Sequence, residues 1–179
     1  MASIQGFDKL VAKLSALGGN VEKAVKIGVH QGVKLVQGEA KGLAPVNDGQ
    51  LRNSIFAEVE AKDGRIEGRV FTNVEHAAYV EFGTGPIGMS SDKKGIPAKV
   101  LNRLHYKQNG WWIHESQIDA KDAEKYHFFR METDNGVYYY TEGQPAQPYL
   151  YPALARSEQR VKTMVRKKLQ EEIQRLGGT

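Results

Sequence analysis

The stretch IFAEVEAKDGRIEGRVFT, residues 55–72, decides the fold because it predicts a β-hairpin. Two short runs rich in apolar residues, Ile55–Glu60 and Ile66–Thr72, lie on either side of the segment Lys62–Arg65. That segment contains Asp63-Gly64, and an Asp-Gly pair between two strand-like runs is a strong sequence signal for a tight hairpin turn. We therefore expect an antiparallel hairpin, which forms a core with the helix that precedes it.

Two helices are predicted before the hairpin. Apolar residues recur at helical spacing from Phe7 to Leu17, and Gly18-Gly19 provides a stop. Asn20 is then a candidate N-cap for a longer helix. The apolar stripe of that helix consists of Val21, Ala24, Val25, Val29, Val33, Val36 and Ala40. Pro45 ends it, because a residue before proline is disfavoured in the helical conformation.

Three glycines interrupt the longer helix, namely Gly28, Gly32 and Gly38. Each weakens a helix by up to ~1 kcal/mol relative to alanine. Glycines at this spacing also allow another backbone to approach closely, which suits a packed or oligomeric element. After Pro45, Asp48 is a candidate cap for a single helical turn that leads into the first strand.

Residues 86–143 differ in composition from the rest, since they hold both tryptophans and nine of the sixteen aromatic residues. We predict a loop over Pro86–Asn102, because this part is rich in glycine, serine and lysine. Short strands are expected at Trp111–Ile113, Tyr126–Glu132 and Val137–Thr141. Asn135-Gly136 predicts a primed turn between the last two strands. The segment is thus expected to be an inserted β-rich aromatic lobe.

The remaining chain predicts a proline-rich break followed by a helix. Neither proline of Gln144–Pro148 has an amide hydrogen to donate, so regular structure is not expected there. A long helix should run from after Pro152 to about Leu176, with the apolar stripe Leu154, Val161, Val165, Leu169, Ile173 and Leu176. The expected fold is α+β, with an antiparallel sheet packed against a long helix and a long C-terminal helix. Residues 1–85 and 144–179 would form the core domain, and residues 86–143 the inserted lobe.

Composition excludes several classes of protein. The chain has 179 residues, of which 40% are hydrophobic and 26% charged, typical of a globular protein with its own core. Without cysteine it has no disulfides, thiolate metal sites or cysteine nucleophile. No apolar run approaches the ~18 residues of a membrane span, so no membrane partner is expected. The absence of cysteine agrees with assembly in a reducing cytoplasm.

The net charge of +4 is concentrated near the C-terminus. Between Arg156 and Arg175, seven basic residues stand against three acidic ones, so this segment carries the whole excess. Such a helix can approach phosphate or an acidic partner, and it can equally be the solvated face of an amphipathic helix. The candidate contacts to phosphate or to an acidic partner are Arg156, Arg160, Arg166 and Lys167.

A search for catalytic or cofactor motifs gives no candidate, so we predict a protein that is not an enzyme and needs no cofactor or metal. The five histidines are scattered and lack the spacing of a helical zinc site. No Gly-x-Ser-x-Gly elbow occurs. Gly83–Gly88 resembles a phosphate loop only in its glycines, because it lacks the Gly-Lys-Ser/Thr ending. We interpret it as a tight connection that needs positive φ.

The pair Trp111-Trp112 leaves two interpretations open. Beside Tyr106 and Lys107 it could stack the bases of single-stranded nucleic acid. Successive strand residues point to opposite faces, so only one tryptophan would be free, and an exposed tryptophan is more often an anchor at a protein interface. With the basic helix, this pair supports an alternative function as a nucleic-acid-binding accessory protein.

Three segments in order resemble one family. They are Ala44–Ile55 (APVNDGQLRNSI), Tyr79–Gly85 (YVEFGTG) and Gln144–Leu154 (QPAQPYLYPAL). Together they are similar to the signatures of the HK97 gp10-like family of siphophage neck and tail-completion proteins. Two departures occur: Asn47-Asp48-Gly49 replaces an acidic residue and threonine before the glycine, and Tyr149 and Tyr151 stand where the family has Phe and often Arg.

The resemblance implies a structural protein of the virion at the head–tail junction, which acts as a homo-oligomer with the shape of a ring. Its implied partners are its own copies and other phage neck and tail proteins, with passive proximity to DNA. We expect Tyr79–Gly85 and Gln144–Leu150 to lie adjacent at the base of the inserted lobe. The candidate interface residues are Tyr79, Glu81, Phe82, Gly83, Thr84, Trp111, Trp112, Gln144, Gln147, Tyr149 and Leu150.

Overall fold

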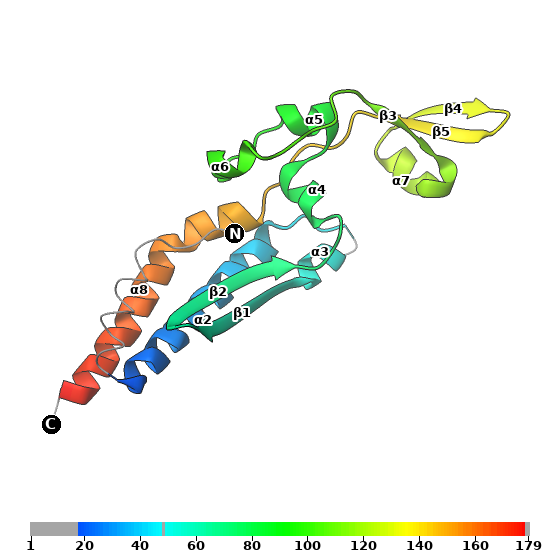
Figure 1. Ribbon diagram of the computed structural model, residues 1–179. Coiled ribbons are helices and arrows are strands. Elements are labelled where there is room, and N and C mark those ends of the chain that lie inside the picture. Colours follow the sequence, from blue (N-terminus) through cyan, green and yellow to red (C-terminus); the bar gives the residue numbers. More distant parts are fainter. Residues whose placement is uncertain (1–17, 48, 178–179) are drawn as a thin grey trace. The chain divides into compact units, whose positions relative to one another are not determined.

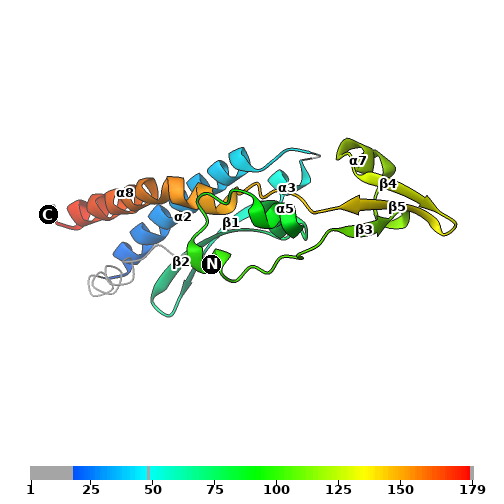
Figure 2. The same cartoon turned by 90° about the horizontal axis from the view of Figure 1, so that it is seen from above.

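The computed structural model describes residues 18–47 and 49–177, which form an α+β protein in two compact units (Figures 1 and 2). Unit 1 comprises the described residues up to Ala77 and those from Pro148 onward, and unit 2 comprises Ala78–Gln147. Unit 2 therefore begins before the expected lobe boundary at residue 86 and ends after the boundary at residue 143. The predicted helix over Phe7–Leu17 and the predicted cap at Asp48 lie outside the described residues.

Two long helices form the centre of unit 1 (Figure 1). Helix α2 spans Gly19–Leu43 and helix α8 spans Leu150–Gly177. The two are antiparallel, because Gly28 of α2 lies against Val165 of α8 and Gly32 lies against Val161. The buried core cluster between them consists of Val21, Val25, Val165 and Leu169.

The glycines of α2 explain how closely the helices approach. A Cβ at residue 28 would lie 2.9 Å from the Cα of Val165, and a Cβ at residue 32 would lie 2.7 Å from a methyl group of Val161. Real Cβ atoms essentially never lie this close to another atom, so the close approach predicted from the sequence is confirmed at both positions. Gly38 has no atom within 4 Å of its Cβ position and plays no such part.

The predicted hairpin is confirmed and lies along α2. Strand β1 (Ile55–Lys62) pairs antiparallel with strand β2 (Arg65–Thr72), in the register that places Ile55 opposite Thr72. Asp63 and Gly64 both have positive φ, at 52° and 72°, as a primed turn requires. Ile66 packs against the helix core, so the hairpin and α2 share a core as expected.

Several helix boundaries in unit 1 differ from the prediction. Helix α2 begins at Gly19 after Gly18, so Asn20 lies inside its first turn and the prediction of Asn20 as N-cap was wrong. The helix ends at Leu43, and Ala44 is extended before Pro45 as predicted. A single helical turn, α3 (Gln50–Asn53), precedes β1. Helix α8 already begins at Leu150, with Pro152 in its first turn, where a missing N–H costs no helical hydrogen bond.

Unit 2 contains a three-stranded antiparallel sheet in the order β3-β5-β4. Its strands are β3 (Trp111–His114), β4 (Phe129–Thr133) and β5 (Gly136–Thr141). A short 3₁₀ helix, η1 (Glu115–Gln117), and helix α7 (Ala120–Lys125) connect β3 to β4. All three strands were expected, although β4 starts three residues after the predicted Tyr126.

Two predictions for unit 2 were wrong. Instead of a loop over Pro86–Asn102, the chain forms helices α5 (Gly85–Ser90) and α6 (Ala98–Leu101), after helix α4 (Ala77–Phe82). The turn before β5 is also not primed, because Gly136 has a φ of 115° whereas Asn135 has no positive φ. This fits a type I turn followed by a glycine, the other common way to close a short hairpin.

Candidate interaction surfaces

The two motifs at the ends of unit 2 lie side by side, as predicted. The N–H of Thr84 donates to the carbonyl of Gln144 at 3.0 Å, and the N–H of Gln144 donates to Oγ1 of Thr84 at 3.1 Å. The N–H of Gln147 donates to the carbonyl of Val80 at 2.8 Å. The segment entering unit 2 and the segment leaving it are therefore held together by backbone hydrogen bonds; we call this contact the motif junction.

Glycine is required at the motif junction. Gly83 and Gly85 have φ values of 74° and 60°, which residues with a side chain rarely adopt. A Cβ at residue 83 would lie 2.7 Å from the nitrogen of Ala146, and a Cβ at residue 85 would lie 2.8 Å from the Trp111 ring. The interpretation of this glycine segment as a tight connection with positive φ is thus confirmed.

Lys93, which sequence reasoning missed, and Tyr106, which it named only beside the tryptophan pair, support the junction from one side. The ammonium group of Lys93 donates to the carbonyls at the end of α5, those of Gly88, Met89 and Ser91. Its Nζ also lies 5.2 Å from the ring centroid of Tyr106. The Tyr106 hydroxyl donates to the carbonyl of Phe82 at 2.8 Å, and burial raises the pKa of this tyrosine. No local sequence pattern signals these contacts, because they join segments far apart in the chain.

The candidate interface residues divide into exposed and packed groups. In unit 2, Tyr79, Gln144 and Gln147 are exposed, Phe82 and Thr84 are half-buried, and Glu81 and Gly83 are buried. In unit 1, Tyr149 is fully buried and Leu150 is half-buried. The exposed group therefore offers the most side-chain surface to a partner.

Trp111 and Trp112 point to opposite faces of the unit 2 sheet, as strand alternation predicts. Trp111 is half-buried, and Nζ of Lys107 lies 4.8 Å from its ring centroid. Trp112 is 42% exposed, and its ring centroid lies 5.2 Å from that of Tyr140 and 6.0 Å from that of Phe129. One tryptophan is therefore available on the surface.

Trp112 belongs to a row of aromatic side chains across all three strands. It pairs with Tyr140 of β5, which pairs in turn with Phe129 of β4. A second row lies on the same face, two residues away from the first on each strand. It consists of His114, Tyr138 and Met131. We call this surface the aromatic face; sequence alone predicted the exposed tryptophan but not its alignment with Phe129.

The outer face of the β1–β2 hairpin is the corresponding surface of unit 1. Phe56 and Phe71 lie opposite each other there, with ring centroids 6.0 Å apart, and are 45% and 38% exposed. Arg69 forms ion pairs with Glu58 at 2.9 Å and Glu60 at 3.1 Å beside them. Among the described residues the sheet has two strands, so each strand has one edge without a strand partner.

The basic helix α8 uses much of its charge internally. Lys162, Lys168 and Arg175 pair with glutamates of the same helix, and Arg160 pairs with Glu39 of α2 at 3.1 Å. The pairs lower the pKa of Glu171, mainly through a hydrogen bond from Lys168, and that of Glu172, mainly through a hydrogen bond from Arg175. The candidate phosphate contacts Arg156, Arg160, Arg166 and Lys167 are all exposed.

Within residues 18–47 and 49–177, no group of three or more His, Asp or Glu side chains is placed to hold a metal ion. The same part of the chain has no helix that is long and apolar enough to span a membrane. The surfaces that the structure does show are strand edges, an aromatic face and exposed side chains.

Comparison with known families gives one match. Residues 8–83 match a family model, HK97-gp10-like, whose description is "Bacteriophage HK97-gp10, putative tail-component". No curated protein and no solved structure matches the chain. The matched residues include α2, the hairpin and the YVEFG part of the motif junction. The family resemblance inferred from the sequence is thus confirmed over this segment.

Proposed function

From the match of residues 8–83 to the HK97-gp10-like family of phage tail components, we propose that this chain is a non-enzymatic subunit of an oligomeric, ring-shaped assembly at the head–tail junction. The match itself supports a structural role in a phage tail. The neck position, the ring and the absence of catalysis are further parts of our proposal, which go beyond the match. In this proposal the chain assembles in the host cytoplasm and stays bound to neck and tail proteins.

The β1–β2 hairpin supports self-association in a ring. A closed ring of subunits pairs one surface of each copy with a different surface of the next, so no edge is left open. The hairpin offers two different unpaired edges, and its outer face exposes Phe56 and Phe71. We propose that neighbouring subunits meet at this hairpin and cover both phenylalanines.

The first test is the mass of the purified protein at two concentrations and two salt levels, with and without purified tail tubes. We expect a discrete oligomer, or a monomer that forms a ring only on tubes. Subunit contacts through apolar and backbone groups should change little with salt. A monomer at every concentration that ignores tail tubes would overturn the proposal.

A pair of variants locates the contact. Phe56→Ser with Phe71→Ser should abolish the oligomer, because it removes the apolar surface of the hairpin's outer face. Val46→Ser is the matched control, since Val46 also belongs to unit 1 and is 61% exposed but lies before the hairpin. Equal oligomer formation by both variants would exclude the hairpin as the contact.

The aromatic face favours a second function, that of a nucleic-acid-binding accessory protein. Its row of Trp112, Tyr140 and Phe129 presents π-surfaces on which bases can stack. Binding to phosphates would weaken steeply with salt, by roughly one log–log unit per phosphate contacted. Binding of single-stranded DNA that is salt-sensitive and lost in Trp112→Ala or Arg166→Ala would support this function. No binding at low salt would exclude it.

A further inference from the structure

Strand β4 of unit 2 has an edge without a strand partner among the described residues. The sheet order β3-β5-β4 places β4 at the edge, and all five of its residues are exposed. Such an edge presents backbone N–H and C=O groups that can pair with another chain. β4 contains no proline, and the charged side chains that could oppose such pairing are one of each sign, Arg130 and Glu132.

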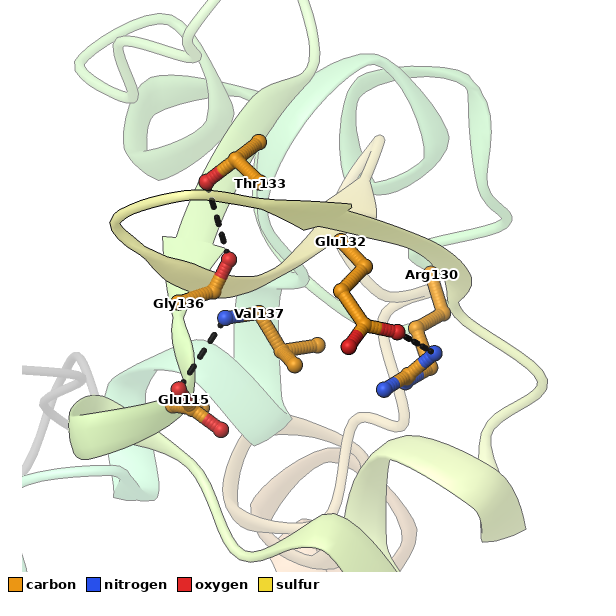
Figure 3. Close-up of polar contacts among 6 residues, drawn as sticks. All are labelled: Glu115, Arg130, Glu132, Thr133, Gly136 and Val137. Carbon is orange, nitrogen blue, oxygen red and sulfur yellow. Dashed lines mark hydrogen bonds and ion pairs between the residues drawn. The ribbon is translucent and has the colours of Figure 1, made fainter.

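The charges of β4 are arranged symmetrically about its central residue. Arg130 and Glu132 project from the same side of the strand (Figure 3). Met131 separates them in the sequence. In the single chain they form an ion pair at 3.1 Å, with the two side chains 53% and 71% exposed. A surface pair of this kind contributes little stability, so both groups remain available to a partner.

This pattern is complementary to itself in one register. If two β4 strands pair antiparallel about Met131, Arg130 of each copy faces Glu132 of the other. A two-fold axis at Arg130 would instead place the two arginines opposite each other, and an axis at Glu132 would place the two glutamates opposite each other. Opposite charges across a strand pair are favourable and like charges are unfavourable. Among pairings of the five β4 residues, Phe129–Thr133, charge therefore selects the register centred on Met131.

We propose that β4 is a docking strand for a second copy of this chain, paired antiparallel and two-fold symmetric about Met131. Two sheets of three strands then join into one of six. The backbone supplies hydrogen bonds, as in other cases of strand addition, and the two Arg130–Glu132 pairs set the register.

Pairing of the two β4 strands would bury part of the aromatic face. Phe129 is 66% exposed and Met131 is 39% exposed, both on that face. In the paired strands Met131 lies opposite Met131 of the second copy, and Phe129 lies opposite Thr133. Apolar and aromatic cross-strand pairs add to the stability of a sheet.

This contact is separate from the ring proposed above. It joins identical surfaces about a two-fold axis, so it closes after two copies and cannot by itself build a ring. It lies wholly within unit 2, whereas the proposed ring contact uses the hairpin of unit 1. The contact would therefore couple subunits in pairs, or hold two assemblies together.

A cysteine introduced at residue 131 tests the symmetry axis directly, because the natural chain has no cysteine. In Met131→Cys the two thiols face each other across the axis, at the spacing that a disulfide requires. Thr133→Cys is the matched control on the same face of the same strand. Its two copies would lie roughly 13 Å apart along the strands, too far for a disulfide. We expect rapid oxidative dimerisation for the first variant and at least about tenfold slower dimerisation for the second.

Charge variants of Met131→Cys test the register. Arg130→Glu leaves only glutamates in the contact, and Glu132→Arg leaves only arginines, so each should reduce the cross-linking rate at least about tenfold. An equimolar mixture should restore it, because each arginine then faces a glutamate. The double variant Arg130→Glu with Glu132→Arg should also restore it. Restoration by the mixture distinguishes cross-strand pairing from loss of the ion pair within one chain.

Two results would overturn the proposal: equal cross-linking of Met131→Cys and Thr133→Cys, or charge variants that cross-link as fast as their parent. The ring is judged separately, from the mass of Met131→Cys with Arg130→Glu, kept reduced, with and without tail tubes. A ring that persists in this variant while cross-linking is lost supports both contacts. Loss of the ring from Phe56→Ser with Phe71→Ser, with cross-linking unchanged, would show that the two are independent.

Discussion

Replacing Gly28 with alanine should force α2 and α8 apart. The new methyl carbon would lie 2.9 Å from the Cα of Val165, and backbone cannot move aside as a side chain can. Gly38→Ala is the matched control, because it makes the same change in the same helix with no atom within 4 Å of the new carbon.

The two variants share one favourable effect and differ in one unfavourable effect. Alanine stabilises a helix interior by up to ~1 kcal/mol relative to glycine, so Gly38→Ala should raise the free energy of unfolding by about that amount. Forcing an extra carbon into a packed interface typically costs about 1–3 kcal/mol. Gly28→Ala should therefore lie about 1–3 kcal/mol below Gly38→Ala.

Gly32→Ala should fall between them. Its methyl would meet a methyl group of the Val161 side chain at 2.7 Å, and that side chain can shift more easily than backbone. The measurement is urea unfolding of unit 1, followed by far-UV circular dichroism. Equal unfolding free energies for Gly28→Ala and Gly38→Ala would refute the close helix contact on which the fold of unit 1 rests.

Three further predictions concern the junction, the core and pH. Gly83→Ala should destabilise unit 2 by at least ~1 kcal/mol, because residue 83 has positive φ and its Cβ would lie 2.7 Å from the nitrogen of Ala146. Proteolysis within unit 2 should then become faster. Ser157→Ala should leave the free energy of unfolding unchanged or raise it by roughly 1 kcal/mol, because the buried hydroxyl has no hydrogen-bond partner among the described residues. An unfolding free energy in urea that falls by more than about 1 kcal/mol would contradict this. Acidification should fray the end of α8, because the hydrogen bond from Arg175 lowers the pKa of Glu172 below its usual 4.5 in the folded chain. That stabilisation is present above the unfolded pKa of 4.5 and is lost as pH falls through the lower folded value. Glu172→Gln should abolish the pH dependence of the amide protection factors there, which are exchange rates relative to those of the unfolded chain at the same pH. An unchanged dependence would assign it to another group.

Local sequence patterns determined the elements whose signals lie within a few residues. The hairpin was predicted from the apolar runs around Asp63-Gly64. The tight turn requires positive φ at both central residues, and an Asp-Gly pair adopts this conformation readily. The apolar stripes of α2 and α8 followed from helical periodicity. Glycine at residues 28 and 32 predicted a close approach but could not name the partner, because Val165 and Val161 lie more than 120 residues away in the chain.

The aromatic face shows the same division. Strand alternation predicted that a single tryptophan would be exposed, and Trp112 is that residue. Its alignment with Tyr140 and Phe129 depends on the register of three strands, in which β3 pairs with β5 and not with β4, the next strand along the chain. The charges of Arg130 and Glu132 can be read from the sequence. They indicate strand pairing between copies only once the sheet order shows that β4 is the edge strand.

Helices α5 and α6 formed where composition predicted a loop. Glycine, proline and serine lower helix propensity, but propensity is a weak term that tertiary contacts override. The last carbonyls of α5 accept hydrogen bonds from Lys93, and Gly88 in that helix lies directly against Gly83 of the motif junction. By itself the sequence determined the strands, the long helices and the resemblance of residues 8–83 to the HK97-gp10-like family, because these signals are periodic or contiguous. Only the tertiary structure decided which glycines touch, which strand is left at an edge and which charges remain free, because these depend on contacts between residues far apart in the chain.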